Sequence, residues 1–347
     1  MEDHNENQSE NKVSNSSESP NSATAAPQET VAPRRIAQEL SFKVHQEISK
    51  VIIGQKELVD LLVIALITEG HVLIEGVPGI AKTTTAKLFS KSISSAFSRI
   101  QFTPDLMPTD VTGTSVFNLK SSEFEFKKGP IFSNIVLIDE INRAPAKTQA
   151  ALFEVMEEQQ ISVDGTTYPF EDPFMVLATQ NPIEQEGTYK LPEAQLDRFV
   201  FKAKLHYPSV EEELEILNKF SEDFSMSAKN ELVEVITPAD IKAAKQEVEK
   251  VYISKELMKY IAQIVQETRE NADLFLGASP RASLAILKTA KALAAINGRN
   301  FVTPEDIQSM MPPILNHRIM LAPDKEIEGY ETEDVISDII KKIEVPR

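Results

Sequence analysis

The chain has 347 residues, which at about 150 residues per domain predicts two folded domains plus a tail. Charged residues make up 26% and hydrophobic residues 41%, a composition that excludes a disordered or fibrous class for most of the chain. The 36 basic and 53 acidic side chains give a net charge of −17, the wrong sign for a protein that binds phosphates along a duplex. We therefore do not expect nucleic acid to be the main partner.

Several kinds of site and segment are also not expected. The chain has no cysteine, and its five histidines lack the spacing of metal ligands. Its acidic start lacks the basic and apolar regions of a secretory signal. The longest apolar run, Leu61–Ile67, is far shorter than the roughly 18 residues that cross a bilayer. We expect a cytoplasmic protein with no insertion into a membrane.

The first 33 residues differ in composition from the rest. Val13 and Val31 are their only bulky aliphatic side chains, among serine, asparagine, glutamate, proline and alanine. Because such a stretch buries too little surface to offset its chain entropy, residues 1–33 are predicted to be a disordered acidic and polar tail. An acidic arm that binds a partner is the alternative.

Helix and strand patterns alternate in the next part of the chain. A helical pattern over Lys56–Thr68 and a strand pattern over His71–Glu75 precede a helical pattern over Lys82–Ser94. Two later apolar runs, Ile135–Ile138 and Phe174–Thr179, are typical of parallel strands buried on both faces. Short buried strands between helices predict an α/β fold with a doubly wound parallel sheet.

A hairpin is predicted between the last two of these strands. In Ile161–Tyr168, the pair Asp164-Gly165 is flanked by β-branched and aromatic residues, which is a strong signal for a two-residue turn. We expect this hairpin to project from the α/β core, which is predicted to span residues 34–208.

The remaining residues, 209–347, show helical patterns and no strand pattern. Two helices are predicted to begin after Thr237 and Thr303, each a capping threonine followed by proline at the first helical position. The stretch Arg281–Ile296 carries an amphipathic stripe. A second, smaller, all-helical domain is therefore predicted.

The segment Glu75–Thr84 joins the first predicted strand to a helix, where free backbone amides and the helix dipole attract anions. Lys82 is expected to reach the β- and γ-phosphates of a nucleotide, and the Thr83 hydroxyl to bind Mg²⁺. The usual pattern has glycine before the lysine, whereas Ala81 adds one methyl group and keeps the amide. A plain turn before an exposed lysine is the alternative. The candidate phosphate-binding residues are Gly76, Val77, Pro78, Gly79, Ile80, Ala81, Lys82, Thr83 and Thr84.

Two carboxylates, Asp139 and Glu140, end the strand pattern that begins at Ile135. Carboxylates there are costly unless a cation lies close, and Mg²⁺ at the preceding loop would be that cation. Asp139 is expected to hold the metal ion, and Glu140 to orient and polarise the attacking water. An acidic turn after an ordinary strand is the alternative.

Three further residues are candidates for the same chemistry. Asn181 closes the next strand pattern and could hydrogen-bond the attacking water or the γ-phosphate, although Asn-Pro is also an ordinary turn. Arg198 and Arg281 are single cations, for which a surface salt bridge is the alternative.

The segments GVPGIAKT, LIDEINRAP, ATQNPIEQEGTYKLPEAQLDRF and SPRA occur in the order seen in MoxR-type AAA+ ATPases. The chain resembles that family from about residue 36 to residue 320. The phrase EQEGTYKLPEAQLDRF is more specific than the P-loop, which many unrelated NTPases share. The resemblance implies a P-loop AAA+ core with a helical lid, ATP and Mg²⁺ as cofactors, and ATP hydrolysis.

The resemblance also assigns roles to single residues. It makes Asn181 the sensor 1 residue, Arg281 the sensor 2 arginine of the lid, and Arg198 the arginine finger that acts on a neighbouring subunit. Ile53 and Gly54 lie in the segment that contacts adenine, and the predicted hairpin becomes a pre-sensor insertion facing the pore of a ring.

The function that the resemblance implies is an ATP-driven chaperone that remodels or activates client proteins. It would act as a homo-oligomeric, hexameric ring, commonly together with von Willebrand factor A domain proteins. The alternatives are a DNA-translocating or helicase-type motor, a chelatase motor subunit, and a nucleotide switch without turnover. The acidic charge argues against the first and Glu140 against the last, while the chelatase stays open.

Overall fold

The computed structural model describes residues 35–182, 187–222 and 232–346. Residues 34–347 form one compact unit. The predicted disordered tail, residues 1–33, lies outside the described residues. No helix within the described ranges is long and apolar enough to cross a bilayer.

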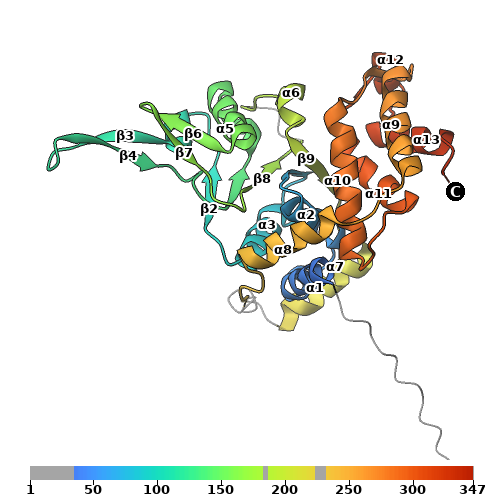
Figure 1. Cartoon of the computed structure of the whole chain (residues 1–347), viewed down its shortest axis with the longest axis horizontal. Coiled ribbons are helices and arrows are strands. Elements are labelled where there is room, and N and C mark those ends of the chain that lie inside the picture. The colour runs from blue at the N-terminus through green and yellow to red at the C-terminus, as the bar shows by residue number, and fades with distance from the viewer. Residues whose placement is uncertain (1–34, 183–186, 223–231, 347) are drawn as a thin grey trace, which may run out of the picture. The chain divides into compact units, whose positions relative to one another are not determined.

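The centre of the unit is a five-stranded sheet with the strand order β2-β5-β8-β1-β9 (Figure 1). All four neighbouring pairs are parallel. This confirms the predicted parallel sheet and the three strands expected from apolar runs. The strands are β1 (His71–Gly76), β2 (Phe97–Gln101), β5 (Ile135–Asp139), β8 (Met175–Gln180) and β9 (Phe199–Leu205).

The two outer strands, β2 and β9, were not predicted from the sequence. Both are edge strands, so each pairs on one side only. In β9, Lys202 and Lys204 alternate with buried Phe201 and Ala203. Such a strand has no continuous apolar run, which was the signal used for the central strands.

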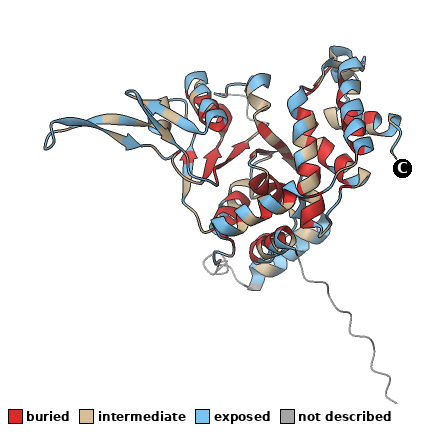
Figure 2. Ribbon diagram, viewed as in Figure 1, coloured by how far each residue is buried: buried red, intermediate tan, exposed pale blue. Residues whose placement is uncertain are grey.

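The sheet is covered on both faces because successive side chains of a strand point to opposite sides. In β1, Val72 and Ile74 belong to one core cluster and Leu73 belongs to the other. The first cluster includes apolar residues of α1, α2 and α3, and the second includes residues of α4 and α5. Buried residues concentrate in this sheet and its covering helices (Figure 2). The helices are α1 (Ile36–Ser49), α2 (Lys56–Ile67), α3 (Lys82–Lys91), α4 (Pro108–Thr112) and α5 (Ala146–Glu158).

Two hairpins project from the sheet on the side away from the last helices (Figure 1). One consists of β6 (Gln160–Val163) and β7 (Thr166–Pro169), and it confirms the prediction made from Asp164-Gly165, both of which have positive φ. The other, β3 (Gly113–Asn118) with β4 (Glu123–Lys128), was missed. Its turn contains no glycine, so the local signal was absent.

The helices after residue 208 include the predicted capped ones. At the start of α8, Thr237 N donates to Asp240 Oδ2 at 2.9 Å, and Thr303 N donates to Asp306 Oδ2 at 2.8 Å before α11. Beyond the expected helices, β10 (Leu274–Leu276) and β11 (Met320–Leu321) form a short antiparallel sheet. The predicted boundary at residue 208 remains a prediction. A short helix, α6 (Glu193–Leu196), precedes residue 208. The helices after it are α7 (Val210–Glu222), α8 (Pro238–Glu249), α9 (Lys255–Glu270), α10 (Pro280–Ile296), α11 (Pro304–Leu315), α12 (Pro323–Ile327) and α13 (Thr332–Lys342).

Candidate nucleotide-binding site

The loop between β1 and α3 has the backbone of an anion cradle. Gly79 has a φ of +90°, a conformation that side chains rarely adopt, and Ala81 has a φ of 62° immediately before α3 begins at Lys82. Left-handed residues in a tight turn let successive amides point toward one space at a helix N-terminus. Ala81 occupies this conformation in place of the usual glycine, so the backbone of the loop is preserved.

Lys82 spans the space between two strands. Its Nζ donates to the carbonyl oxygen of Gly76 at the end of β1, and to that of Gln180 at the end of β8 at 3.2 Å. Partial burial lowers the pKa of Lys82, while the nearby carboxylates of Glu140, Glu75 and Asp139 act in the opposite direction. The ammonium group therefore lies among acceptors that a phosphate could replace.

Asp139 is buried at the end of β5, and three side chains bond to its carboxylate. Thr83 Oγ1 donates to Oδ1 at 2.8 Å, and Thr179 Oγ1 donates to the same oxygen at 3.2 Å. Arg99 Nε, from β2, donates to Oδ2 at 2.6 Å. The predicted pair Thr83 and Asp139 is thus brought into direct contact, and Arg99 supplies the charge that makes a buried carboxylate tolerable.

Glu140 follows Asp139 with a left-handed φ of 56°, which turns its side chain away from the strand. Its Oε2 accepts from Gln101 Nε2 at 2.9 Å and lies 3.1 Å from Arg143 Nε. Asn181 directly follows the last residue of β8, so it lies at the same end of the sheet as Gly76 and Asp139. We call this end, where Gly76, Asp139 and Gln180 terminate their strands, the phosphate edge.

A cavity of about 1110 Å³ opens beside the loop. Ile53, Pro78, Ala81 and Thr84 line it, so the segment predicted to contact adenine lies next to the predicted phosphate cradle. Gln55 connects the two: its Nε2 donates to Ile80 O at 2.6 Å, and its Oε1 accepts from Thr85 Oγ1 at 2.7 Å.

Gly54 has a φ of +69°, a backbone conformation that side chains rarely adopt. A Cβ atom there would come within 2.4 Å of Glu212 Oε1, the end of a flexible side chain on α7. Because that side chain can move, the positive φ is the feature that favours glycine at this position.

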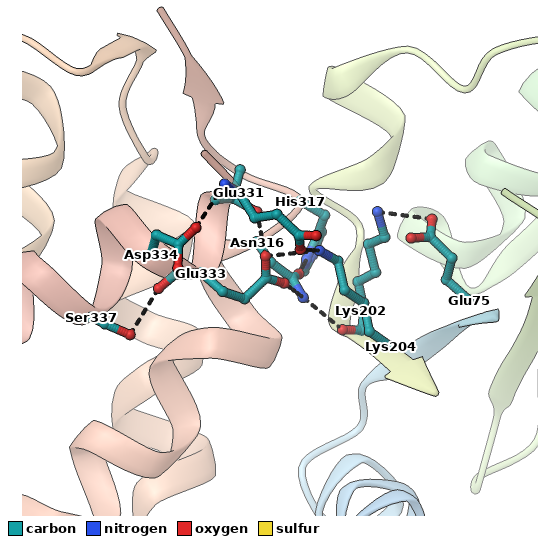
Figure 3. Close-up of polar contacts among 10 residues, drawn as sticks. Glu75, Lys202, Lys204, Asn316, His317, Glu331, Glu333, Asp334 and Ser337 are labelled. Atoms are coloured by element: carbon teal, nitrogen blue, oxygen red, sulfur yellow. Dashed lines mark hydrogen bonds and ion pairs between the residues drawn. The ribbon is translucent and has the colours of Figure 1, made fainter. Parts of the chain in front are cut away.

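On one side of this cavity, a polar network joins β9 to the end of α11 and the start of α13 (Figure 3). Lys202 Nζ lies 2.9 Å from Glu75 Oε2, and Lys204 Nζ lies 2.7 Å from Glu333 Oε2. Asn316 Nδ2 bridges them by donating to Lys202 O at 3.1 Å and to Glu333 Oε1 at 3.3 Å. The network ties the residue before Gly76 to the C-terminal helices.

The two predicted catalytic arginines lie at the other end of the sheet. Arg198 immediately precedes β9, whose first residue, Phe199, pairs with His71 at the start of β1. Arg198 contacts Glu157 on α5, and Arg281 Nη2 lies 2.6 Å from the other oxygen of the same carboxylate. We call this end, where His71 and Phe199 begin their strands, the arginine edge.

The six residues of β1 separate the two edges. At about 3.3 Å per residue, the separation is roughly 16 Å. The structure therefore brings Lys82, Thr83, Asp139 and Glu140 together at one edge, and Arg198 and Arg281 together at the other.

Three residues of these sites were missed by the sequence analysis. Arg99 and Gln101 lie on the unpredicted strand β2, and Glu157 lies on a helix with no motif around it. Their partners are between 39 and 124 residues away along the chain, so no local spacing marks them. The alternation of Arg99 and Gln101 in one short strand was the only usable signal.

The fold and the phosphate edge define a P-loop ATPase. Residues 71–201 match the model of the ATPase family associated with various cellular activities (AAA), and residues 266–339 match that of the AAA lid domain. A crystal structure from Cytophaga hutchinsonii, of a protein described as an ATPase, superposes with a TM-score of 0.81 at 43% identity, covering 90% of this chain and 97% of that one.

Two relatives match over nearly the whole length. YeaC of Bacillus subtilis, an uncharacterized protein, is 46% identical over 88% of this chain and 94% of its own. The chaperone MoxR1 of Mycobacterium tuberculosis is 40% identical over 91% of this chain and 86% of its own. Relatives named as magnesium-chelatase and Holliday junction branch migration subunits match only 55% and 42% of this chain. The chain belongs to the MoxR family of AAA+ ATPases, and it is an ATP hydrolase.

Proposed function

We propose that this chain uses ATP hydrolysis to remodel, mature or activate client proteins, as a chaperone-like hexameric ring in the cytoplasm. The observation that carries the proposal is the direct contact between Thr83 and Asp139, which joins the phosphate loop to the acidic end of β5. Next to that contact, Lys82 and Glu140 supply a cation for phosphates and a carboxylate for water. The name of the relative MoxR1 supports the chaperone part.

In this proposal the phosphate loop, from Gly76 to Thr84, holds the triphosphate through its backbone amides, and Lys82 binds the β- and γ-phosphates. Ile53 and Gly54 hold the adenine at the other part of the cavity. The lowered pKa of Lys82 reflects partial burial, which outweighs the opposite effect of the nearby carboxylates. A bound triphosphate reverses that effect, because its negative charge stabilises the ammonium form.

The residues at the phosphate edge fit Mg²⁺. A hydroxyl and a carboxylate oxygen, Thr83 Oγ1 and Asp139 Oδ1, lie 2.8 Å apart. Mg²⁺ prefers oxygen ligands and is usually held by one or two protein groups besides water and substrate phosphates. Thr83 and Asp139 would hold it, and when bound it would neutralise phosphate charge. Arg99 Nε donates to the other oxygen of that carboxylate, Asp139 Oδ2, at 2.6 Å, so Oδ1 is the oxygen that faces Thr83.

Glu140 is the proposed catalytic carboxylate. It orients and polarises the attacking water, and Asn181, at the end of the adjacent strand, hydrogen-bonds that water or the γ-phosphate. In this conformation, Gln101 donates a hydrogen bond to the Glu140 carboxylate and Arg143 forms an ion pair with it. Both contacts are made by Oε2, so in this proposal the water is bound by the other oxygen, Oε1.

Arg198 and Arg281 act on the nucleotide of a neighbouring copy. Their own phosphate edge is the length of β1 away, beyond the reach of an arginine side chain, whereas the edge of a ring subunit can face the pocket of the next one. An arginine supplied in trans stabilises charge in the transition state by roughly 10³–10⁵-fold in the best-measured cases. The shared carboxylate supports the view that sensor 2 and the finger work at the same neighbouring site.

The proposed partners are further copies of this chain, client proteins, and von Willebrand factor A domain proteins. The helicase-type and chelatase alternatives have weaker support, because the relatives of those kinds match about half of this chain or less. A net charge of −17 also disfavours a motor that tracks nucleic acid.

The test of the catalytic assignment is Glu140→Gln, with Glu158→Gln, an exposed glutamate on α5, as the control. Glu140→Gln keeps ATP affinity and lowers turnover by about 10²–10⁴-fold, as expected for loss of a general base. The control variant keeps both. Turnover of Glu140→Gln within a few-fold of the unaltered chain would reject the assignment. The same variant, used as bait with ATP, should retain client proteins that Lys82→Ala releases.

A further inference from the structure

At the arginine edge, one carboxylate serves two arginines from different elements. Glu157, near the end of α5, contacts Arg198 Nη1 with one oxygen, and its Oε1 accepts from Arg281 Nη2 at 2.6 Å. Arg198 immediately precedes β9, and Arg281 lies in the first turn of α10. Glu157 is 37% exposed, so this junction of three elements lies at the surface.

The second carboxylate at this edge, Asp197, has a different partner. Its Oδ1 lies 2.7 Å from Nε of Arg318, whose side chain is only 3% exposed. Arg318 also donates to Phe199 O at 2.7 Å and to Ile314 O at 2.6 Å. Arg281 lies 3.8 Å from Asp197, too far for a hydrogen bond. Asp197 therefore pairs with Arg318, which bonds to the backbone at the start of β9. Glu157 contacts the ends of both Arg198 and Arg281, and Arg198 Nη1 also donates to Phe153 O on α5 at 2.7 Å.

We propose that Glu157 is a positioning residue for ATP hydrolysis: it holds the guanidinium groups of Arg198 and Arg281 side by side, so that one chain presents both to the triphosphate bound by a neighbouring copy. This inference rests on the proposed function, in which both arginines act in trans. A long arginine side chain samples many rotamers. Each oxygen of the Glu157 carboxylate holds one of the two arginines and so restricts its rotamers. Because two guanidinium groups share one carboxylate, the group keeps a net positive charge for phosphate.

The test uses mixed assemblies of two variant chains and compares the effect of Glu157→Ala on one chain with its effect on the other. The pocket chain carries Arg198→Ala and Arg281→Ala and keeps Lys82. The arginine chain carries Lys82→Ala and keeps both arginines. Copurification of differently tagged chains establishes co-assembly. In the parent mixture, ATP bound to a pocket chain meets the arginines of an arginine chain, and activity appears.

Glu157→Ala on the arginine chain lowers kcat of the mixture by about 10–100-fold, since a misplacement of about 1 Å can cost 10²-fold. The KM for ATP stays within about twofold, because the positioned groups act in the transition state. The same substitution on the pocket chain changes nothing, because that chain has no arginines left to position. Glu158→Ala on the arginine chain is the matched control and leaves kcat unchanged.

Each other outcome has one meaning. If Glu157→Ala lowers kcat equally on either chain, Glu157 has a structural role and the inference is overturned. If Glu157→Ala lowers kcat on neither chain, the inference is also overturned, but the activity of the parent mixture still supports the shared site. An inactive parent mixture despite copurification rejects the shared site and the inference with it. Glu157→Gln keeps the side-chain length but loses the charge and replaces one acceptor oxygen by an NH2 group, which only donates. Its kcat therefore lies between those of the unaltered chain and Glu157→Ala. An unchanged kcat for that variant contradicts the role of the carboxylate.

Discussion

The two ends of the central sheet differ in how they are assembled. At the phosphate edge, the cradle is a continuous loop of backbone, and Thr83 and Asp139 meet across two elements of the same α/β core. At the arginine edge, side chains of α5 and α10, of the two residues before β9, and of Arg318, three residues after α11, meet through ion pairs. One of these pairs joins Arg281 and Glu157, which are 124 residues apart. The phosphate edge depends on local sequence, whereas the arginine edge depends on the helical lid being in place.

The comparison also separates binding from catalysis. The phosphate edge brings together a lysine, a threonine hydroxyl and two carboxylates beside a cavity. The arginine edge brings together two arginines that share one carboxylate. We infer that one chain binds ATP alone and hydrolyses it efficiently only with a neighbour. The predictions below test that division, beginning with the largest effect.

Lys82→Ala should abolish measurable ATP binding in a folded chain. Lys82 supplies the point charge at the phosphates, and each hydrogen bond to a charged group contributes about 1.5–3 kcal/mol. The control is Lys87→Ala, an exposed lysine on the same helix, which should bind ATP normally. If calorimetry finds undiminished ATP binding in Lys82→Ala, the phosphate edge is not the nucleotide-binding site.

Arg318→Ala should destabilise the chain by about 3–5 kcal/mol, because it leaves the Asp197 carboxylate partly buried without its cation. Burial lowers the pKa of Arg318, while Asp197 acts in the opposite direction and keeps it charged. Denaturant unfolding measures the change. The contrasting control is Lys341→Ala, whose pair with Asp338 at 3.3 Å is exposed and should contribute at most about 1 kcal/mol. Equal effects of the two would mean that the arginine edge is not anchored by Arg318.

The arginine edge should also be sensitive to acid through His71. This buried side chain accepts from Val176 N at 3.0 Å, and its Nε2 lies 3.2 Å from Met156 O, next to Glu157 on α5. Burial lowers the pKa of His71 from 6.5 to about 4. In the unfolded chain, His71 therefore binds a proton below about pH 6.5, whereas in the folded chain it binds one only below about pH 4.

The free energy of unfolding should thus be unaffected by His71 above pH 6.5 and should fall between pH 6.5 and pH 4. The fall should be roughly 3 kcal/mol, because each pKa unit corresponds to about 1.36 kcal/mol. Unfolding of the unaltered chain and of His71→Gln across that range measures it, with His206→Gln, at an exposed site, as the control. The slope should flatten in His71→Gln alone. A slope that His71→Gln leaves unchanged would assign the acid sensitivity to another group.

The smallest effect is expected at Ala81. Its φ of 62° suits glycine, so Ala81→Gly relieves strain but adds chain entropy to the unfolded state, and the two changes nearly cancel. Stability should change by less than about 1 kcal/mol and ATP affinity by less than about twofold, because the amide is unchanged. Ala81→Val, a β-branched residue at a positive φ, should be the more damaging variant in the same assays.

The phosphate edge was largely predictable from the sequence because its signals are local. Two glycines, a lysine and a threonine between a strand and a helix define a cradle, and Asp139-Glu140 ends an apolar run. The turn at Asp164-Gly165 was found for the same reason.

The remaining features depend on pairing between distant segments. Edge strand β9 has lysines at alternate positions, so its pattern resembles an exposed segment. Arg99 lies at the phosphate edge only because β2 pairs with β5. Glu157 contacts Arg281 only because the start of α10 lies near the end of α5. No spacing within the sequence encodes such contacts, so the family resemblance, and not periodicity, pointed to Arg198 and Arg281.

The most direct test of the divided site mixes Arg198→Ala chains with Lys82→Ala chains. Each should be nearly inactive alone, the first because its pockets meet no finger and the second because it binds no ATP. In mixed rings, an intact pocket can face an intact Arg198, so ATPase activity should partly recover as the ratio of the two chains approaches one. Full activity of Arg198→Ala alone, or no recovery despite proven co-assembly, would contradict the account and leave Arg198 as a structural partner of Glu157.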